Sequence, residues 1–145
     1  MNTTDLPQFQ DFHLEGVKHI TPEEAINALN NGHAILVDVR EEDEVQDEQF
    51  QAPVVINHPM SVILDRLEFI SKNQSIIVAC VTGERSAKVT NLLNIQGYPS
   101  VANLDGGLRM WKLFGGPVLK SSSSEGGGCG CCCGSGSPES EGSCC

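Results

Sequence analysis

The stretch 76–86 constrains the fold more than any other part of the chain. Its apolar run IIVA, residues 76–79, ends in Cys80, and a short glycine-containing loop then leads to Arg85 and a helical pattern. An unbroken apolar run is typical of a strand that is buried on both faces of a parallel sheet. The stretch therefore predicts a strand, a loop and a helix, with one thiol at the carboxyl end of the strand.

Strand and helix patterns alternate through residues 15–120, which predicts an α/β domain over that range. Strands are expected at 17–20, 34–39, 53–57, 75–79 and 100–104, and helices at 22–30, 41–48, 62–70, 85–96 and 108–114. We expect an open, mostly parallel five-stranded sheet with helices on both faces, because parallel strands are joined by helical crossovers. Residues 1–14 are polar and irregular, and we expect them to form a loosely held N-terminal arm.

The net charge of the 145-residue chain limits the classes of partner that it is expected to bind. Its formal net charge is −10, whereas nucleic-acid binding needs a basic face, so nucleic acid is not an expected partner. The N-terminus lacks the basic and apolar regions of a signal peptide, and no stretch approaches the about 18 apolar residues that span a membrane. We therefore expect a cytoplasmic protein without a membrane partner.

The loop after Cys80 has features that stabilise a thiolate. Ligands of parallel sheets bind beyond the carboxyl ends of the strands, where successive backbone N–H groups and a helix N-terminus favour an anion. Gly83 allows a tight turn, and the planar guanidinium of Arg85 can hold an anionic substrate. These features favour a reactive thiolate over an inert buried thiol.

The length of the loop helps to distinguish two possible reactions of a cysteine nucleophile. Four residues lie between Cys80 and Arg85, one fewer than in the loop of phosphatases that use a cysteine nucleophile. A tighter ring fits a smaller guest, such as one extra sulfur atom on Cys80. The spacing therefore favours persulfide chemistry over the hydrolysis of phosphate or arsenate esters.

Three segments of the chain resemble single-domain rhodanese-like sulfurtransferases. Residues 80–86 match the C-x-x-G-x-R-S active-site loop of that family, 37–40 match its second-strand motif, and 104–111 match its closing L-x-G-G-x-x-x-W motif. The resemblance covers about residues 15–119. It implies that Cys80 is the catalytic nucleophile and that the loop binds substrate through Val81, Thr82, Gly83, Glu84, Arg85 and Ser86.

The resemblance also implies an activity. A sulfane sulfur would move from thiosulfate or a persulfide to a thiol or another nucleophilic acceptor, through a persulfide on Cys80, with no cofactor required. Glu84 places a carboxylate where the thiosulfate dianion would arrive, and that repulsion would cost about 1 kcal/mol at partial exposure. We therefore consider a small-molecule or protein persulfide at least as good a donor, with a thiol or a sulfur-accepting protein as the acceptor.

Several other polar or aromatic residues have simpler explanations. Asp38 and Arg40 are expected to fix strand and loop geometry, and Trp111 is expected to pack in the core. His58 follows a strand near the expected substrate entrance, where an ordinary loop histidine is the simplest interpretation. The remaining histidines lack metal-ligand spacing and are expected at the surface: His13, His19 and His33.

Residues 121–145 consist of Ser, Gly, Cys, Glu and one Pro, and we expect them to form a disordered tail. The six cysteines of the tail are Cys129, Cys131, Cys132, Cys133, Cys144 and Cys145. They could bind a soft metal ion or metalloid, take sulfur from Cys80 by exchange, or have no defined role. The alternative function for the chain is accordingly a thiol-rich metal-binding or sulfur-carrier module with the domain as its scaffold.

Overall fold

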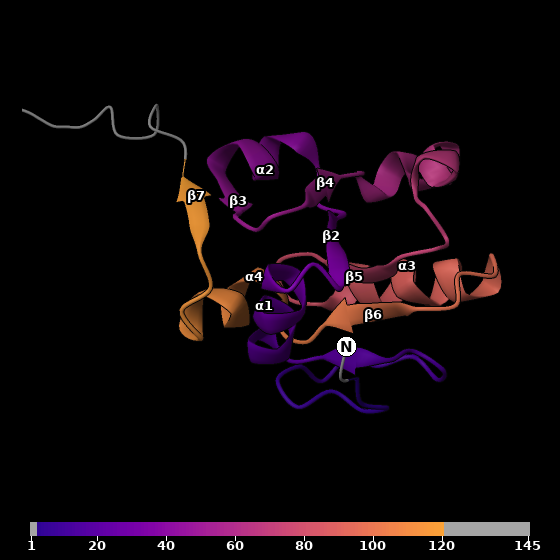
Figure 1. Ribbon diagram of the computed structural model, residues 1–145, viewed down its shortest axis with the longest axis horizontal. Coiled ribbons are helices and arrows are strands. Elements are labelled where there is room, and N and C mark those ends of the chain that lie inside the picture. The colour runs from indigo at the N-terminus through magenta and orange to yellow at the C-terminus, as the bar shows by residue number, and fades with distance from the viewer. Residues whose placement is uncertain (1–2, 121–145) are drawn as a thin grey trace, which may run out of the picture. The chain divides into compact units, whose positions relative to one another are not determined.

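The computed structural model describes residues 3–120 and contains the expected parallel sheet (Figure 1). The sheet has the strand order β1-β6-β5-β2-β4, and every adjacent pair is parallel. The strands are β1 (His19–Ile20), β2 (Ala34–Asp38), β4 (Val55–Asn57), β5 (Ser75–Ala79) and β6 (Val101–Leu104). The predicted α/β class and the five-stranded parallel sheet are confirmed, and β5, which precedes Cys80, is the central strand.

Helices cover both faces of the sheet. They are α1 (Pro22–Asn30), α2 (Glu42–Asp47), the 3-10 helix η1 (Met60–Phe69), α3 (Glu84–Ile95) and α4 (Gly107–Leu113). Alternate residues of β5 face opposite layers, since Ile77 packs with α1 and α4, whereas Ile76 packs with η1 and α3. The central strand is thus apolar on both faces, as the unbroken run indicated.

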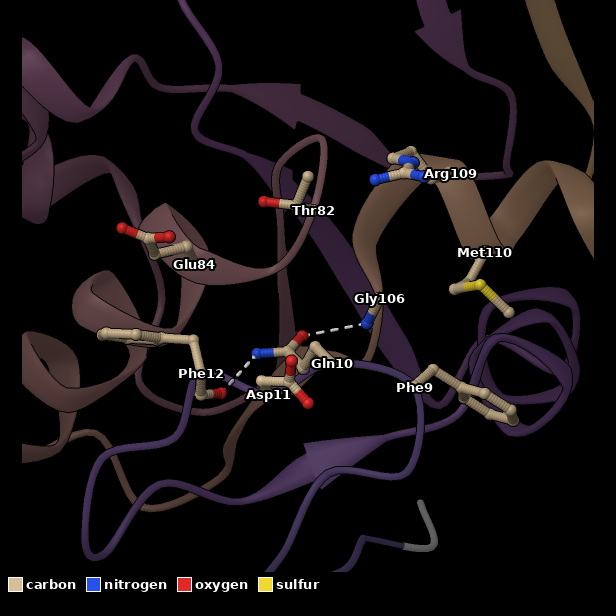
Figure 2. A pocket seen from close by; sticks show the side chains of 9 residues that line it. All are labelled: Phe9, Gln10, Asp11, Phe12, Thr82, Glu84, Gly106, Arg109 and Met110. Carbon is tan, nitrogen blue, oxygen red and sulfur yellow. Dashed lines mark hydrogen bonds between the residues drawn. The ribbon is translucent and has the colours of Figure 1, made fainter.

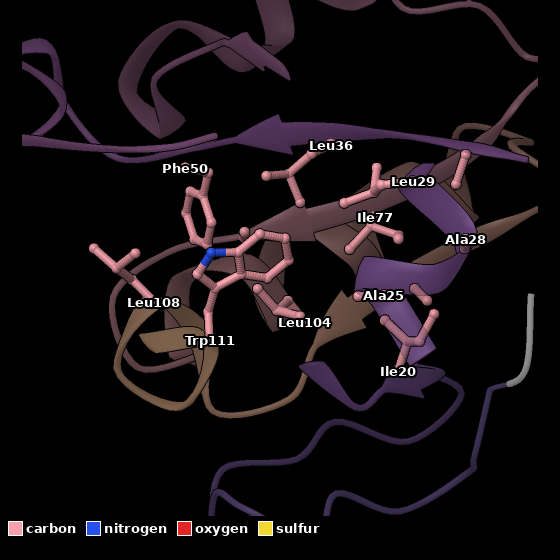
Figure 3. Close-up of a cluster of buried hydrophobic side chains, with 13 residues drawn as sticks. Ile20, Ala25, Ala28, Leu29, Leu36, Phe50, Ile77, Leu104, Leu108 and Trp111 are labelled. Atoms are coloured by element: carbon pink, nitrogen blue, oxygen red, sulfur yellow. The ribbon is translucent and has the colours of Figure 1, made fainter. Parts of the chain in front are cut away.

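Trp111 anchors α4 in one of these two layers, which confirms the expected core position (Figure 3). Its side chain is 1% exposed and meets the ring of Phe50 edge-to-face, with 5.3 Å between the ring centroids. The indole N–H donates to the carbonyl oxygen of Pro117 at 2.8 Å, so the polar atom of this buried side chain is satisfied. This anchoring fixes the beginning of α4, which contacts the Cys80 loop.

Two elements differ from the expected pattern. The segment expected to be helical at 62–70 is the 3-10 helix η1, and only Ile63 within it is fully buried, so little packing favours the α form. The acidic helix α2 ends at Asp47, and β3 (Glu48–Phe50) pairs instead with β7 (Val118–Lys120). Neither three-residue segment, EQF or VLK, lies in an apolar run or an alternating pattern long enough to predict a strand.

The chain divides into two compact units. The larger unit runs to Val45 and from Phe50 to Val118, and it holds the parallel sheet and its helices. Of the described residues, the smaller unit holds 46–49, Leu119 and Lys120, and within it Lys120 lies 4.0 Å from a carboxylate oxygen of Glu48. No helix within residues 3–120 combines the length and apolar character needed to cross a bilayer.

The N-terminal arm is not loosely held, contrary to the expectation from its polar sequence. Thr4 and His19 exchange two backbone hydrogen bonds, of 2.7 and 2.8 Å. Further along the arm, the carboxylate of Asp105 accepts hydrogen bonds from the N–H groups of Gln8 and Phe9. Asp105, which directly follows β6, therefore fastens the arm to the end of that strand. His19, expected at the surface, is fully buried because the arm covers β1.

Candidate active site

Cys80 lies directly after the central strand β5, at the carboxyl edge of the sheet, and is 1% exposed. Its Sγ accepts a hydrogen bond from the backbone N–H of Gly83 at 3.0 Å, and the hydroxyl of Ser86 lies 3.4 Å away. Both groups belong to the predicted loop. The thiol is thus held by the loop that follows it, in the position that the sequence pattern indicated.

Gly83 is required at its position for two reasons. Its backbone is left-handed, with φ of +97°, and it immediately precedes α3. A Cβ at this position would lie 1.8 Å from the amide oxygen of Gln10 in the N-terminal arm. Gly83 therefore permits both the turn that aims its N–H at Cys80 and the close approach of the arm.

The beginning of α4 orients the first peptides of the loop. The N–H groups of Leu108 and Arg109 donate to the carbonyl oxygens of Cys80 and Val81, at 2.8 and 3.1 Å. Because the C=O and N–H of one trans peptide point in opposite directions, the next two N–H groups in the loop face away from α4. A Cβ on Gly107 would lie 2.5 Å from the oxygen of Val81, so this contact also depends on a glycine.

Most N–H groups of the loop are available to a ligand. Within residues 3–120, five of them make no hydrogen bond: those of Val81, Thr82, Glu84, Arg85 and Ser86. The last three also form the N-terminus of the twelve-residue helix α3. Backbone donors that converge at a helix N-terminus favour an anion, so the loop can stabilise negative charge at or beyond the sulfur of Cys80.

Arg85 is held by a carboxylate of the same unit. Its two terminal nitrogens donate to the two carboxylate oxygens of Glu44, at 2.8 and 2.9 Å. Hydrogen bonding to Arg85 lowers the pKa of Glu44 from 4.5 to about 2, and the same bonds raise the pKa of Arg85. The sequence indicated that Arg85 could grip the donor, whereas the structure places its guanidinium on Glu44, where it fixes the beginning of α3.

Asp38 and Arg40 have the structural role that was expected of them. They form a buried ion pair of 2.8 Å in which each side chain is 2% exposed. The side-chain amide of Asn57 donates to the backbone oxygens of both residues, at 2.9 and 3.0 Å. These contacts join the carboxyl ends of β2 and β4 beside the Cys80 loop.

A buried chain of polar groups continues from Ser86 away from the loop. The Ser86 hydroxyl makes a short hydrogen bond to the amide oxygen of Asn103, whose amide nitrogen lies 3.0 Å from Nδ1 of His19. Nε2 of His19 lies 2.8 Å from Nδ1 of His13. Burial lowers the pKa of His19, which favours the neutral ring with Nδ1 as acceptor. This chain fixes the hydroxyl that contacts Cys80.

Sequence reasoning identified Ser86 but missed the polar chain beyond it and the residue that completes that chain. Gln10 accepts from Asn103 at 3.1 Å and from the Gly106 N–H at 2.9 Å, and it donates to the carbonyls of Phe12 and Gly83. The only available signal was Asn103 itself, a polar residue within the apolar strand 101–104. Nothing in the polar arm distinguishes Gln10 from its neighbours.

A pocket of about 510 Å³ lies beside the Cys80 loop (Figure 2). The arm, the loop and the beginning of α4 contribute its lining residues: Phe9, Gln10, Asp11, Phe12, Thr82, Glu84, Gly106, Arg109 and Met110. Two predicted loop residues, Thr82 and Glu84, therefore face the pocket. A volume in this range accommodates a small molecule.

His58 follows β4, as expected, but it is buried rather than in an open loop. Neither ring nitrogen has a hydrogen-bond partner within the described residues, and burial together with the charge of Arg66 lowers its pKa. Other residues line the pocket beside the Cys80 loop. The structure therefore does not bring His58 to that pocket.

The predicted tail site lies outside the described residues. All six of its cysteines are beyond position 120, so metal binding or sulfur relay there stays a prediction. Within residues 3–120, no group of three or more His, Cys, Asp or Glu side chains is arranged to hold a metal ion.

The chain belongs to the rhodanese-like domain family, whose model matches residues 21–113. It is similar to a sulfurtransferase of Allochromatium vinosum, with 34% identity over 85 residues that cover 59% of this chain and 78% of the relative. It is also similar to the thiosulfate sulfurtransferase GlpE of Pseudomonas savastanoi, with 35% identity over 102 residues that cover 66% of this chain and 87% of the relative.

Solved structures agree with this assignment. The rhodanese-like domain of an Anabaena protein, determined in solution, superposes with a TM-score of 0.66 at 25% identity, over 76% of this chain and 85% of that one. A rhodanese-related protein of Thermoplasma volcanium shares the fold with a TM-score of 0.62, over 70% of this chain and 96% of that one.

Proposed function

We propose that this chain is a sulfurtransferase that carries a sulfane sulfur as a persulfide on Cys80. The observation that carries the proposal is the position of the sulfur, which lies 3.0 Å from the Gly83 N–H within a loop whose other N–H groups are largely unpaired. Such a ring stabilises an anionic sulfur and the second sulfur atom attached to it. The names of the two related sulfurtransferases support the same class of activity.

The first step forms the persulfide. The Cys80 thiolate attacks the outer sulfur of a donor persulfide, the S–S bond of the donor breaks, and the donor leaves as a thiolate. A bond between Cys80 and the transferred sulfur replaces the broken bond, so the number of S–S bonds and the total charge are unchanged. With thiosulfate as the donor, the leaving group is sulfite.

The second step transfers the sulfur to an acceptor. An acceptor thiolate attacks the outer sulfur, forms a new persulfide and releases Cys80 as a thiolate, ready for another cycle. Sulfur moves between thiolates without net oxidation or reduction, so the proposed cycle needs neither a metal nor an organic cofactor. The Gly83 N–H, 3.0 Å from the sulfur, is positioned to donate to that thiolate, whereas the nearby Ser86 hydroxyl donates its single proton to Asn103.

Turnover of the full chain with thiosulfate or a small persulfide and an excess of thiol acceptor tests this proposal. Cys80→Ser should reduce turnover to the uncatalysed background, because no other group in the loop can carry sulfur. Cys145→Ser is the matched control, and it should retain activity. Activity that survives Cys80→Ser would contradict the proposal.

A further inference from the structure

We propose that the pocket beside the Cys80 loop binds a small zwitterionic thiol, one with a carboxylate and an ammonium group, whose persulfide is the sulfur donor. This inference rests on the proposed function and names the class of its substrate. The pocket adjoins the loop directly, because Thr82 and Glu84 belong to both. The occupant therefore lies next to the chain segment that holds the reactive sulfur.

Arg109 supplies the carboxylate recognition. It is exposed on α4, and its guanidinium has no ion-pair or hydrogen-bond partner within residues 3–120. Its backbone N–H donates to the oxygen of Val81 at 3.1 Å, so the residue is fixed against the Cys80 loop. A guanidinium that no protein group uses, at the edge of a pocket, is suited to bind a carboxylate through two parallel hydrogen bonds.

Two carboxylates supply the ammonium recognition. Asp11 and Glu84 both line the pocket, and Figure 2 shows Glu84 on the side opposite Arg109, with Thr82 between them. Lys88 lies 3.8 Å from a carboxylate oxygen of Glu84 and offsets only part of this negative charge. Two carboxylates against one guanidinium disfavour a dianion such as thiosulfate, whereas a zwitterion matches both ends of the pocket.

Gln10 serves as the floor of the pocket rather than as a ligand (Figure 2). Its amide oxygen already accepts two hydrogen bonds, and its amide nitrogen already donates two. A glutamine side chain has no further hydrogen-bonding capacity. Recognition of charged groups therefore falls to Asp11, Glu84 and Arg109, while Phe9 and Phe12 offer apolar surface for the carbon stem of the ligand.

Three forms of one donor test the charge recognition: cysteine persulfide, its N-acetyl form and its methyl ester. The rate at which sulfur appears on Cys80 of the full chain is measured by peptide mapping. We expect each blocked form to load on the order of tenfold more slowly than cysteine persulfide, the effect of losing one charged hydrogen-bonded contact. Equal rates for the three donors would overturn the proposal.

Two variants test which residues recognise the carboxylate and the ammonium group of the donor. Arg109→Gln should reduce the preference for the free acid over the methyl ester, and D11N combined with E84Q should reduce the preference for the free amine over the N-acetyl form. Lys72→Gln, which removes a positive charge outside the pocket, should leave both preferences unchanged. An Arg109→Gln protein that loads all donors more slowly by one common factor would contradict a role in recognition.

A binding measurement separates this proposal from the proposed function. S-methylcysteine is a zwitterion without a reactive thiol, and its binding to the full chain by calorimetry requires no chemistry at Cys80. We expect binding that Arg109→Gln weakens about tenfold. If no donor loads Cys80, the proposed function is wrong whatever binds. If donors load but S-methylcysteine does not bind, only the pocket assignment is wrong.

Discussion

Arg85 is a residue whose role in the structure differs from the role that its sequence motif suggests. An arginine after a thiolate loop suggests a substrate ligand, yet both terminal nitrogens of this guanidinium are bonded to Glu44. The sequence contains both residues, but 40 positions separate them, and no local pattern joins them. Only the tertiary structure brings α2 to the beginning of α3.

Replacing Glu44 with glutamine should therefore destabilise the protein in a pH-dependent manner. The pKa of Glu44 is depressed from 4.5 to about 2 in the folded state, so its contribution is present above pH 4.5 and is lost as the pH falls toward 2. Because the pair is one-third exposed, we expect a difference of only about 1 kcal/mol in unfolding free energy at pH 7.

Denaturant unfolding at several pH values measures this difference. Asp43→Asn is the matched control, since it removes an exposed carboxylate from the same helix. The control should differ little from the wild type at any pH. A difference between wild type and Glu44→Gln that persists unchanged at pH 2 would refute the assigned ion pair.

Gly83→Ala should be more damaging than the same change at Gly32. Both residues have a left-handed backbone, which costs an alanine about 1 kcal/mol. A Cβ at Gly32 meets nothing within 4 Å, whereas at Gly83 it would displace the fully hydrogen-bonded amide of Gln10, at about 1 kcal/mol for each bond lost. Unfolding free energies of the two variants provide the comparison.

A double variant isolates the steric part of this effect. Combining Gly83→Ala with Gln10→Ala removes the atom that the new Cβ would meet. We expect the double variant to lose less stability than the sum of the two single variants. Strictly additive losses would mean that Gln10 does not press on the loop.

The N-terminal arm is the element that sequence reasoning described least well. Strands and helices with an apolar face can be recognised from the regular spacing of their apolar residues. This spacing placed the strands of the parallel sheet and their helices to within a few residues. The arm is held instead by hydrogen bonds in which backbone N–H groups donate to the side chains of Asp105 and Gln10, and such contacts leave no periodic pattern in the sequence. His19 is buried because the arm covers β1, so its burial could not be predicted from the sequence either.

His19 should make the protein less stable in mild acid. Burial and the charge of His13 lower its pKa in the folded state, and Asp105 opposes them only in part. The unfolded chain therefore takes up a proton first, so stability is full above pH 6.5 and falls as the pH drops below that value. His58, whose pKa is also lowered, contributes in the same direction.

Unfolding free energies between pH 7.5 and about pH 5 test this expectation, a window chosen around the ordinary pKa of histidine. His19→Asn should show a shallower decline than the wild type, and the exposed His33→Asn should not. Equal slopes for wild type and His19→Asn would show that His19 does not titrate as its surroundings indicate.

At the scale of the whole molecule, the acidic charge should govern the response to salt. The chain carries a net charge of −10, and two carboxylates line the pocket beside the loop. The rate of Cys80 loading by thiosulfate should rise roughly two- to fivefold as the ionic strength increases from about 0.01 to 0.15 M, because salt screens this repulsion. Loading by a zwitterionic donor should change little. A thiosulfate rate that falls with salt would indicate a basic path to the site.

The position of the first transferred sulfur tests the central claim most directly. The full chain contains seven cysteines, and Cys80, the one within residues 3–120, lies at the carboxyl end of the central strand. After brief exposure to one equivalent of a persulfide donor and rapid quenching, peptide mapping by mass spectrometry locates the added sulfur atom. We expect it to appear first on the peptide containing Cys80. Sulfur found only on peptides from the cysteine-rich tail would contradict it.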